Sequence, residues 1–555
     1  MAWYVGDTET THDAENDNAW IWLWSICSVD NPNDIAYGHD GESLIVELEK
    51  HVGDRVYFHN LKYDGEFIFW LLDAMNYKWL PEDRRQYVKT YKTLITDDRQ
   101  VYAIKISPEG RGYVELYDSL KVIMLPVRDI AKAYGLPESK GEIDYEMLRP
   151  VGYMATDEEL DYIRRDVQIV AMALQRFESD GESAMTSASN AMRYYKKLLG
   201  GNGHFRKVYP VLDKVADDFI RKSYRGGFTY VKKAVQGLDV YDGLVYDVNS
   251  LYPSVMYNEV LPYYEPLWFD GEPTKTEEYP LFIVNIDVWF VIKPGHIPTM
   301  QLKRNIKFGQ TEYIEDSQGV INCTLTSVDL ELLEEQYDIE YIQYNGGYKF
   351  HGNAEQFKSY IDYWTDVKIS AAKDGNKGLR SMAKLKLNSL YGKFASRMTG
   401  DTRKPVIDDD VLRYVLVEGE DRKPVYTAVG AFVTAYARAK TIRTAQSVYD
   451  RFCYADTDSI HITGTEQPQI DIDDYRLGAW KLESRFTRAR FLRAKCYIEE
   501  IEGSNVVHVA GMPHNVHEQV DFDNFHMGAV YQDKLYTKHV KGGIILIRGD
   551  MELRE

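Results

Sequence analysis

Cysteine is scarce in this sequence. The chain has only four cysteines in 555 residues, Cys27, Cys323, Cys453 and Cys496. They are far apart, without the paired spacing of zinc ligands. Their number and spacing exclude a disulfide-stapled secreted scaffold and a zinc-finger site, and they suit a reducing compartment. We expect the four thiols to be buried.

Long hydrophobic runs are also missing. No stretch approaches the roughly 18 uninterrupted apolar residues of a membrane span. The sequence begins MAWYVGDTETTHD, with acids where a secretory signal needs basic and then apolar residues. We therefore expect a soluble protein that is not secreted and has no membrane partner.

Positive charge is in deficit. Lys and Arg total 66 against 86 Asp and Glu, a net charge of -20, which by itself argues against a nucleic-acid partner. One local segment differs. Residues 485–497, RFTRARFLRAKCY, combine five cations and no acid with aromatic residues, a composition suited to phosphates and stacked bases. In isolation, an ordinary solvated face is the simpler interpretation.

The length predicts several domains, because 555 residues exceed what one hydrophobic core organises. The first 180 or so residues read as an α/β domain, with strand-like segments at 2–10, 20–29 and 55–61. A long helix follows, and Thr156 and Glu159 form a capping box at its start. A second helix is predicted over 183–200, ending at glycines, and the first domain boundary lies near its beginning.

The rest of the chain alternates between helical and strand-rich segments. Residues 259–356 are rich in Pro and Tyr with short strand-like pieces, as in an inserted module. Two helices flank the polar tip KDGNKG at 373–378 and predict a projecting helical hairpin. A charged β-hairpin is expected over 398–421, and 422–555 mixes one helix with strands.

A first acidic set begins with Asp7 and Glu9, which share a face because strand side chains alternate. The pair alone is weak, since surface acids are common and solvated. Asp64 in FHNLKYDGEF and Tyr162 and Asp166 in YIRRD add to it; the last two are four apart and so stack on one helical face. Their order resembles the proofreading 3′–5′ exonucleases of the DEDDy class, an RNase H-like fold.

That resemblance implies roles for the set. Asp7, Glu9, Asp64 and Asp166 would bind two metal ions, oxygen ligands suit Mg²⁺ or Mn²⁺, and Tyr162 would orient the attacking water. Lys140 would assist near the phosphate. Residues in or beside the motifs would hold the single strand: Thr10, His59, Asn60, Tyr63, Phe67, Ser119, Leu120 and Tyr145. For Phe67 and Leu120, burial in the core explains the residue type equally well.

A second acidic set lies in apolar surroundings. Asp456 and Asp458 again share a strand face, and Asp247 ends an apolar strand in GLVYDVNSLYP. Buried carboxylates without counter-charge are costly, so metal ions are the natural partners. Asp247 and Asp458 would clamp two ions about 3.5–4 Å apart, with the Val248 carbonyl as a further ligand and Asp456 as a supporting one.

Between these aspartates, LRSMAKLKLNSLYGKF at 379–394 predicts a helix with a distinctive face. Arg380, Lys384, Asn388 and Tyr391 fall within an arc of about 80°. Such a face could hold a triphosphate and pack a ring against the forming base pair. A solvated cationic face is the alternative, but it does not explain Asn388 and Tyr391 on the same stripe.

Three motifs in order, DxxSLYP, KxxxNSxYG and YxDTDS, resemble those of family B DNA polymerases. The stretches YRGG, DVNSLYP, LNSLYGKFAS and LRAKCYI narrow the resemblance to the protein-primed, phi-twenty-nine-like polymerases of small linear-genome bacteriophages, from residue 4 to about 550. Such enzymes replicate linear double-stranded DNA by strand displacement. Tyr252 would then exclude a ribose 2′-hydroxyl, and Lys368, Arg380 and Lys384 would bind the incoming triphosphate. DNA contacts are implied for Tyr224, Gly226, Gly227, Lys393, Thr434, Arg438, Lys495 and Tyr497.

The implied architecture is a multidomain α/β and α+β protein, with an exonuclease domain followed by a right-hand polymerase. The expected divisions are 1–185 exonuclease, 186–258 and 422–509 palm, 259–356 terminal-protein contact, 357–397 fingers, 398–421 processivity and strand displacement, and 510–555 thumb. Expected partners are primer-template and single-stranded DNA, deoxynucleoside triphosphates and a terminal protein primer. The expected cofactors are two Mg²⁺ or Mn²⁺ ions per active site.

The resemblance further implies a virus-encoded monomer in the host cytoplasm. Two other functions stay open on the residues alone. One is a non-catalytic acidic scaffold that binds cations or a partner protein. The other is a nuclease whose C-terminal half only binds DNA.

Overall fold

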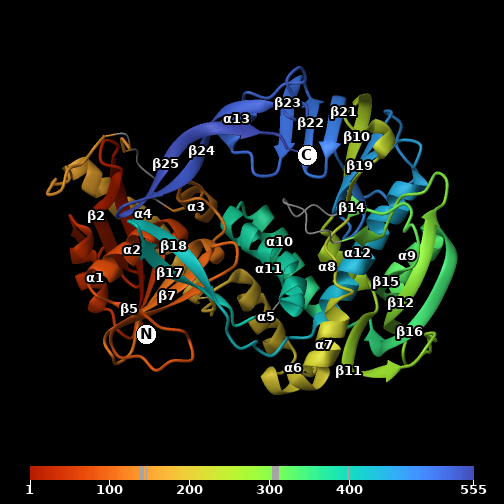
Figure 1. Cartoon of the computed structure of the whole chain (residues 1–555), viewed down its shortest axis with the longest axis horizontal. Helices are drawn as coiled ribbons and strands as arrows, with labels where there is room; N and C mark the ends of the chain where they lie inside the picture. Colours follow the sequence, from red (N-terminus) through yellow and green to blue (C-terminus); the bar gives the residue numbers. More distant parts are fainter. Residues whose placement is uncertain (137–142, 146, 180, 303–311, 397–398, 555) are drawn as a thin grey trace.

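The computed structural model describes residues 1–136, 143–145, 147–179, 181–302, 312–396 and 399–554. An N-terminal domain lies at one side of the molecule and a strand-rich region at the other, with helices between them (Figure 1). A C-terminal hairpin spans from that region back to the N-terminal domain. No helix in the described ranges is long and apolar enough to cross a membrane.

The N-terminal domain is built on an eight-stranded mixed sheet in the order β3-β2-β1-β4-β8-β7-β6-β5. Its strands are β1 (Trp3–Asp13), β2 (Asn18–Ser28), β3 (Ile35–Gly38), β4 (Arg55–Phe58), β5 (Lys78–Trp79), β6 (Val88–Ile95), β7 (Val101–Glu109) and β8 (Val114–Asp118). Its helices are α1 (Gly41–Glu49), α2 (Leu61–Ala74), the 3₁₀ turn η1 (Ser119–Lys121), α3 (Val127–Tyr134) and α4 (Asp157–Ser179). β1 pairs antiparallel with β2 and parallel with β4.

The predicted capping box at the start of α4 is confirmed. The Thr156 backbone N–H donates to Glu159 Oε2 at 2.9 Å, and the Glu159 N–H donates to Thr156 Oγ1 at 3.3 Å. Each residue thus satisfies a donor that the first helical turn would leave without a partner. The capped start fixes the register of α4 and with it the face that carries Tyr162 and Asp166.

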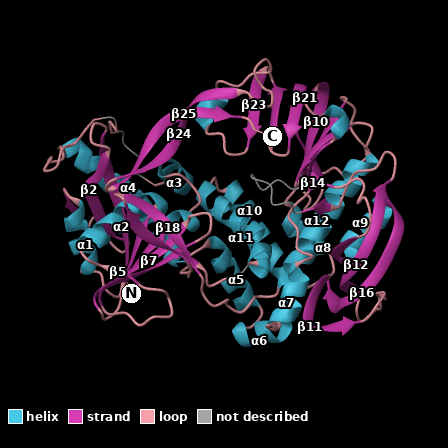
Figure 2. Ribbon diagram, in the orientation of Figure 1, coloured by secondary structure: helices cyan, strands magenta, loops and turns pink. Residues whose placement is uncertain are grey.

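A second, seven-stranded sheet has the order β23-β22-β21-β10-β20-β19-β9. Its strands are β9 (Thr229–Val231), β10 (Asp239–Val248), β19 (Phe452–Asp456), β20 (Ser459–Thr463), β21 (Trp480–Arg493), β22 (Cys496–Ile501) and β23 (Ser504–Val509). The neighbouring helical elements are α5 (Ser187–Leu198), α6 (Asn202–Val208), α7 (Lys214–Arg221), η2 (Lys233–Val235), α8 (Leu251–Asn258) and α12 (Thr427–Ser447). Figure 2 shows the helices between the two sheets.

The segment 259–356 has a sheet of its own, in the order β11-β16-β12-β15. Its elements are β11 (Leu261–Phe269), β12 (Leu281–Ile292), β13 (Gln301–Leu302), β14 (Glu312–Tyr313), β15 (Ile321–Thr326), α9 (Ser327–Gln336) and β16 (Tyr337–Asn353). The strand-like character expected of this segment is confirmed, and two of its strands are long. β12 has 12 residues and β16 has 17, because β16 continues along two neighbours through irregular registers.

The predicted hairpins are confirmed. The helical one is α10 (Lys358–Lys373) with α11 (Lys377–Ala395), and the β-hairpin is β17 (Thr402–Asp408) with β18 (Val411–Val417). The C-terminal part carries α13 (His514–His517) and the long hairpin β24 (Val530–Val540) with β25 (Gly543–Glu552). Three cysteines are buried as expected, but Cys323 is only half-buried.

Candidate active sites

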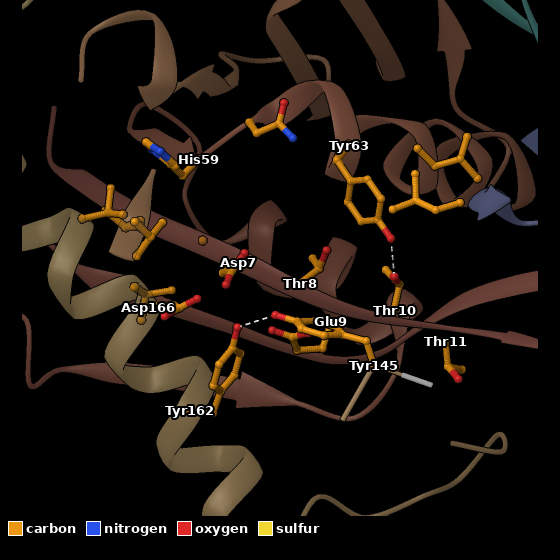
Figure 3. A pocket seen from close by; sticks show the side chains of 18 of the residues that line it. Asp7, Thr8, Glu9, Thr10, Thr11, His59, Tyr63, Tyr145, Tyr162 and Asp166 are labelled. Atoms are coloured by element: carbon orange, nitrogen blue, oxygen red, sulfur yellow. Dashed lines mark hydrogen bonds between the residues drawn. The ribbon is translucent and has the colours of Figure 1, made fainter. Parts of the chain in front are cut away.

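A cavity of about 730 Å³ opens in the N-terminal domain. Asp7 and Glu9 of β1 and Tyr162 and Asp166 of α4 line it together (Figure 3). The strand presents alternate side chains to one face, and the helix presents residues four apart on one stripe. Two elements distant in the sequence thereby converge on one acidic pocket.

The helical face has the predicted orientation. Tyr162 and Asp166 are each 3% exposed, whereas Arg164 and Arg165 between them are half-buried and point elsewhere. Arg165 pairs with Asp161, and Arg164 lies over the Tyr37 ring. The two arginines therefore do not neutralise the pocket from the same helical face.

The Tyr162 hydroxyl is held in its protonated form. Burial, a 2.6 Å hydrogen bond with the Tyr145 hydroxyl and the nearby carboxylates of Asp166 and Glu9 all raise the pKa of Tyr162. A phenol that keeps its proton can donate to an oxygen bound in the cavity. This suits a residue that orients a water molecule.

Asp64 lies behind the cavity rather than on its wall. It is 4% exposed, and Thr8 Oγ1 donates to its Oδ1 at 2.6 Å. Burial, together with the nearby Asp118 carboxylate, raises the pKa of Asp64 to about 7, against the lowering effect of the Thr8 hydrogen bond. Three of the four predicted carboxylates line the cavity and the fourth packs beneath β1.

Several residues expected to hold a single strand do border the cavity: Thr10, His59, Asn60, Tyr63 and Tyr145. Tyr63 and Thr10 join through their hydroxyls at 2.7 Å. The His59 ring contacts Ser119 Oγ at 3.0 Å and the Leu125 carbonyl at 2.8 Å. These bonds fix the orientation of the side chains before any ligand is present.

Two other residues expected to contact the strand are buried. Ser119 is completely buried and its hydroxyl donates to the Phe58 carbonyl at 3.2 Å, while Phe67 is 1% exposed within the core. Their contact with DNA stays a prediction. Leu120 is half-buried, and Lys140 lies outside the described residues.

The cavity includes residues that we did not predict. Ile544, Ile545 and Leu546 of β25 line it, although they follow Asp7 by more than 500 residues in sequence. Their apolar type gives no signal of this role. Only the docking of the C-terminal hairpin on the N-terminal domain brings them there.

The second acidic set lies where β10 meets β20. Asp247 pairs with Ser459 across the two strands, and the Val248 N–H donates to the Asp458 carbonyl at 2.8 Å. The turn between Asp456 and Asp458 is tight, with Thr457 at φ +60°. The sheet register thus brings Asp247 and Asp458 to the same end of the sheet.

The two carboxylates repel each other. Burial, followed by the nearby carboxylates of Asp458 and Glu483, raises the pKa of Asp247 to about 7. Burial also raises the pKa of Asp458. A divalent cation bound by the two carboxylates would offset their repulsion and their burial. Asp247 and Asp458 therefore fit the expected metal ion chemically.

Asp456 has a different environment. Lys495 Nζ contacts its two oxygens at 2.7 and 3.0 Å, and Thr229 Oγ1 donates to it at 3.2 Å. The carboxylate is therefore already neutralised by a protein cation. Asp456 therefore differs from Asp247 and Asp458 in having a lysine bonded to both of its oxygens, although its charge still raises the pKa of Asp458.

The predicted face of α11 points toward the same sheet end. Burial, Arg380 and Lys384 together lower the pKa of Lys368, so these three cations lie close to one another. The Lys384 charge also lowers the pKa of Asp247 and of Asp458, against the effect of burial. The structure therefore gathers a cationic group opposite a carboxylate pair.

Two rings complete this region. Tyr252 of α8 stacks on Tyr391 of α11, with ring centroids 4.2 Å apart and planes at 22°. Lys368 Nζ donates to Ser250 Oγ at 3.3 Å. On α11, Asn388 is exposed and Lys393 is half-buried. Burial and the nearby Arg422 lower the pKa of Lys393.

Some residues expected to contact DNA are buried here too. Thr434 and Arg438 are 1% and 2% exposed. Thr434 bonds to helix carbonyls, and Arg438 Nη2 donates to Asp329 at 2.6 Å. Tyr497 is 8% exposed and stacks on His508. These side chains are inside the protein, and their contact with DNA stays a prediction.

The cationic segment 485–497 is largely committed to internal contacts. Arg488 and Arg490 both bind Asp239, and Arg490 Nη1 also donates to two carbonyls, those of Phe522 and Phe525. Arg493 donates to the carbonyl of Arg554. These arginines tie the second sheet to the C-terminal part of the chain, in place of the continuous phosphate-binding patch that the composition allowed.

The loop YRGG at 224–227 lies against the second site. A Cβ on Gly227 would be 2.8 Å from Thr457 and 3.1 Å from the Tyr252 hydroxyl. Arg438 Nη1 donates to the Gly226 carbonyl at 2.9 Å. Tyr224 is half-buried nearby and acts on the pKa of Tyr252.

Sequence reasoning missed three acids. Glu483 acts on Asp247 and Asp458 from β21, Asp118 binds the backbone N–H of Asn60, and Asp329 anchors Arg438. Glu483 sits on the strand that pairs with β10, two residues after the partner of Asp247. That strand pairing is a tertiary fact, and no local motif marks it.

In the described part of the chain, no three His, Cys, Asp or Glu side chains stand close enough together to hold a metal ion by themselves. A metal ion at either site would therefore need further ligands from water or substrate. Mg²⁺ keeps several waters and commonly takes its other ligands from substrate phosphates, so an open arrangement of this kind suits it.

Comparison with known proteins extends these observations. A family model described as DNA polymerase type B, organellar and viral, matches residues 112–477. The DNA polymerase of Bacillus phage Nf is 40% identical over 98% of this chain and 97% of its own. That of Streptococcus phage Cp-1 is 30% identical over 100% and 99%.

A solved structure agrees over the full length. The phi29 DNA polymerase complexed with primer-template DNA and incoming nucleotide substrates has a TM-score of 0.93 to this chain. The two are 37% identical, and the match covers 100% of both chains. The expected multidomain α/β and α+β fold class is thereby confirmed.

Proposed function

The chain belongs to the type B DNA polymerases of organelles and viruses, among the phi29-like phage DNA polymerases, and we propose that it combines synthesis with proofreading in two separate active sites. DNA-directed DNA synthesis follows from membership of this family, which leaves no place for a non-catalytic scaffold. The observation that carries the proposal is the presence of two acidic sites, one on β1 and α4 and one on β10 and β20.

For synthesis, the end of β10 and β20 would be the reacting centre. Asp247 and Asp458 would hold the metal ions, with the Val248 carbonyl as a further ligand. Lys368, Arg380 and Lys384 form a cationic group that would bind the triphosphate. The Tyr252 ring, supported by its stack on Tyr391, would fill the space of a ribose 2′-hydroxyl.

For proofreading, the cavity of the N-terminal domain would take the primer end. Asp7, Glu9 and Asp166 would face the scissile phosphate, and the protonated Tyr162 would orient the attacking water. Asp64 would contribute from behind β1, where Thr8 holds its carboxylate. Tyr63, His59 and Tyr145 would hold the frayed strand.

Enzymes of this family use divalent metal ions. We infer Mg²⁺ or Mn²⁺, two per site, because the donors are carboxylate and carbonyl oxygens. When bound, the ions would activate the attacking oxygen and offset charge on the phosphate. The protein side chains orient the reacting groups and separate the two reactions in space.

The remaining segments suggest how DNA is held. We propose that 259–356 contacts a terminal protein whose hydroxyl primes synthesis, and that 398–421 closes a ring around DNA and supports strand displacement. The other divisions would be an exonuclease domain (1–185), a palm (186–258 and 422–509), fingers (357–397) and a thumb (510–555). β17–β18 and β24–β25 both contact the N-terminal domain, as such a ring requires.

Separable loss of the two activities tests the two-site proposal. Asp458→Ala should abolish Mg²⁺-dependent extension of a primed template and leave degradation of single-stranded DNA intact. Asp7→Ala should do the reverse, so each variant is the matched control for the other. Loss of both activities from either substitution, in protein that keeps its melting temperature, would refute two sites. Degradation without any extension by the parent enzyme would favour a nuclease.

Protein priming needs its own experiment. The enzyme is incubated with the cognate terminal protein, labelled dATP and Mg²⁺, and covalent protein–nucleotide adduct is measured. The Asp458→Ala variant provides the blank. Failure of the parent enzyme to form adduct, while it extends a DNA primer normally, would argue against protein priming alone.

A further inference from the structure

A single buried carboxylate lies where three parts of the chain meet. Glu66 is on α2 of the N-terminal domain and is 5% exposed. Tyr414 of β18 donates its hydroxyl hydrogen to Glu66 Oε1 at 2.7 Å. His539 of β24 places Nε2 3.3 Å from Glu66 Oε2. One side chain thus contacts both hairpins that reach the N-terminal domain.

Apolar packing surrounds this junction. Leu412 of β18 and Val540 of β24 are each 2% exposed, and both belong to the hydrophobic core of the N-terminal domain. The Tyr414 ring packs edge-on against Phe69 at 6.3 Å. The junction is therefore sheltered from water, where a hydrogen bond to a charged oxygen is strongest.

Backbone and ionic contacts flank the junction on both sides. Thr402 of β17 exchanges hydrogen bonds with the strand β6, and the Lys541 carbonyl accepts from the Ala19 N–H at 2.9 Å. Lys541 Nζ also reaches Asp410 in the turn of the other hairpin, at 3.4 Å. The two hairpins thus touch each other as well as the N-terminal domain, as their positions in Figure 1 suggest.

The chemistry of Glu66 links the two hairpins. A buried carboxylate is stable only while it keeps its polar partners. The two described here, the Tyr414 hydroxyl and the His539 ring, come from β18 and β24, which lie more than 100 residues apart in sequence. Withdrawal of either hairpin would leave the carboxylate poorly compensated, so docking of one favours docking of the other. Burial and the Glu66 charge raise the pKa of Tyr414, which keeps its hydroxyl protonated as a donor.

We propose that Glu66 is a positioning residue, here called the clasp, that holds β17–β18 and β24–β25 on the N-terminal domain. By keeping the ring closed it would increase the number of nucleotides added in each binding event. This inference rests on the proposed ring function of these hairpins. It assigns Tyr414 and His539 to processivity, the number of nucleotides added per binding event. It assigns them no part in the chemistry of nucleotide addition.

Tyr414→Phe tests the clasp, because it removes one hydroxyl and keeps the ring. Product length is measured on a primed single-stranded circle, with excess unlabelled primed DNA as a trap that limits each enzyme to one binding event. We expect products shorter by about tenfold or more, as for loss of one hydrogen bond to a charged group. Addition of one nucleotide to a short primer-template, and degradation of single-stranded DNA, should be unchanged.

Tyr77→Phe is the matched control. The Tyr77 hydroxyl donates to Glu49 Oε1 at 2.5 Å inside the N-terminal domain, so this substitution removes the same type of bond away from the hairpins. It should leave product length unchanged. Glu66→Ala should also shorten the products. The double variant Glu66→Ala/Tyr414→Phe should give products no shorter than those of Glu66→Ala, because both substitutions remove the same interaction.

The outcomes separate the clasp from the ring. A parent enzyme that adds few nucleotides per binding event would overturn the ring function and the clasp with it. A processive parent matched in product length by Tyr414→Phe would overturn the clasp alone. Equal shortening by Tyr77→Phe, or a parallel loss of single-strand degradation in Tyr414→Phe, would also overturn it, since the effect would then be a general one on the N-terminal domain.

Discussion

Lys495 Nζ lies 2.7 and 3.0 Å from the two carboxylate oxygens of Asp456, which gives this aspartate a protein cation as its partner. For Asp247, burial and then the Asp458 carboxylate raise the pKa, and for Asp458, burial and then Asp456 and Glu483 do so. Two aspartates of one motif thus have opposite electrostatic environments. The pair that lacks compensation is the better candidate for binding metal.

This difference predicts unequal effects of substitution. Asp458→Asn should reduce nucleotide incorporation more than about a thousandfold, because a metal ligand is lost at the reacting phosphate. Asp456→Asn should cost about tenfold or less, comparable to loss of one charged contact. Incorporation of one nucleotide on a primed template measures both, and single-strand degradation is the control. Equal losses would contradict the distinction.

Stability without metal should fall as pH rises. The pKa values of Asp247 and Asp64 are about 7 in the folded protein, raised mainly by burial, against 3.8 ordinarily. Between these values the folded state holds more protons than the unfolded state, so ionisation destabilises it. We expect the melting temperature in EDTA to decrease between about pH 4 and pH 7 on this account.

Added Mg²⁺ should reverse this trend, because it binds ionised carboxylates. The rise in melting temperature on adding MgCl₂ should be larger at pH 8 than at pH 5.5. Asp247→Asn combined with Asp64→Asn is the control and should remove most of the difference. A rise that is independent of pH in the parent protein would contradict the assignment.

Gly227→Ala should impair synthesis specifically. The added methyl group would lie 2.8 Å from Thr457 and 3.1 Å from the Tyr252 hydroxyl, closer than ordinary contact. Movement of Tyr252 should raise KM for the nucleotide more than it lowers kcat, while single-strand degradation is retained. Gly203→Ala is the control, since no heavy atom lies within 4 Å of its Cβ position. Normal KM in Gly227→Ala would show that the loop can yield without disturbing the site.

Asp329→Asn should destabilise the fold. Burial by itself would raise the pKa of Asp329, but Arg438 and Arg225 outweigh it and lower the pKa. The change leaves two buried guanidinium groups without their counter-charge, at a cost of about 3–5 kcal/mol. Denaturant unfolding measures this cost, and exposed Asp474→Asn is the control. A loss of DNA affinity with unchanged stability would restore a direct DNA role for Arg438.

Side chains that share a face of one helix or one strand could be predicted from the sequence. Tyr162 and Asp166 share a buried face because helices repeat every 3.6 residues, and Asp7 and Glu9 reach one cavity because strand side chains alternate. The capping box at Thr156 and the two hairpins follow from equally local rules. For these residues the chemistry and the geometry are properties of a short segment.

How deeply a motif residue is buried was decided by packing. Ser119, Phe67, Thr434 and Arg438 lie in or beside motifs, yet the fold buries them, because neighbouring elements cover positions that no local pattern marks. The segment 485–497 has the composition of a nucleic-acid surface. Two of its arginines, Arg488 and Arg490, instead donate hydrogen bonds to Asp239, and Arg490 also donates to a C-terminal carbonyl.

The two acidic sets, the order of the motifs and the helices and hairpins that carry them could be predicted from the sequence, because short-range periodicity controls them. Three contacts are visible only in the folded chain: Lys495 with Asp456, Glu483 near Asp247, and Glu66 with two distant hairpins. Each of these contacts joins residues far apart in the chain. Such pairs are fixed by sheet register and domain docking, in which many weak contacts act together and no single segment carries the information.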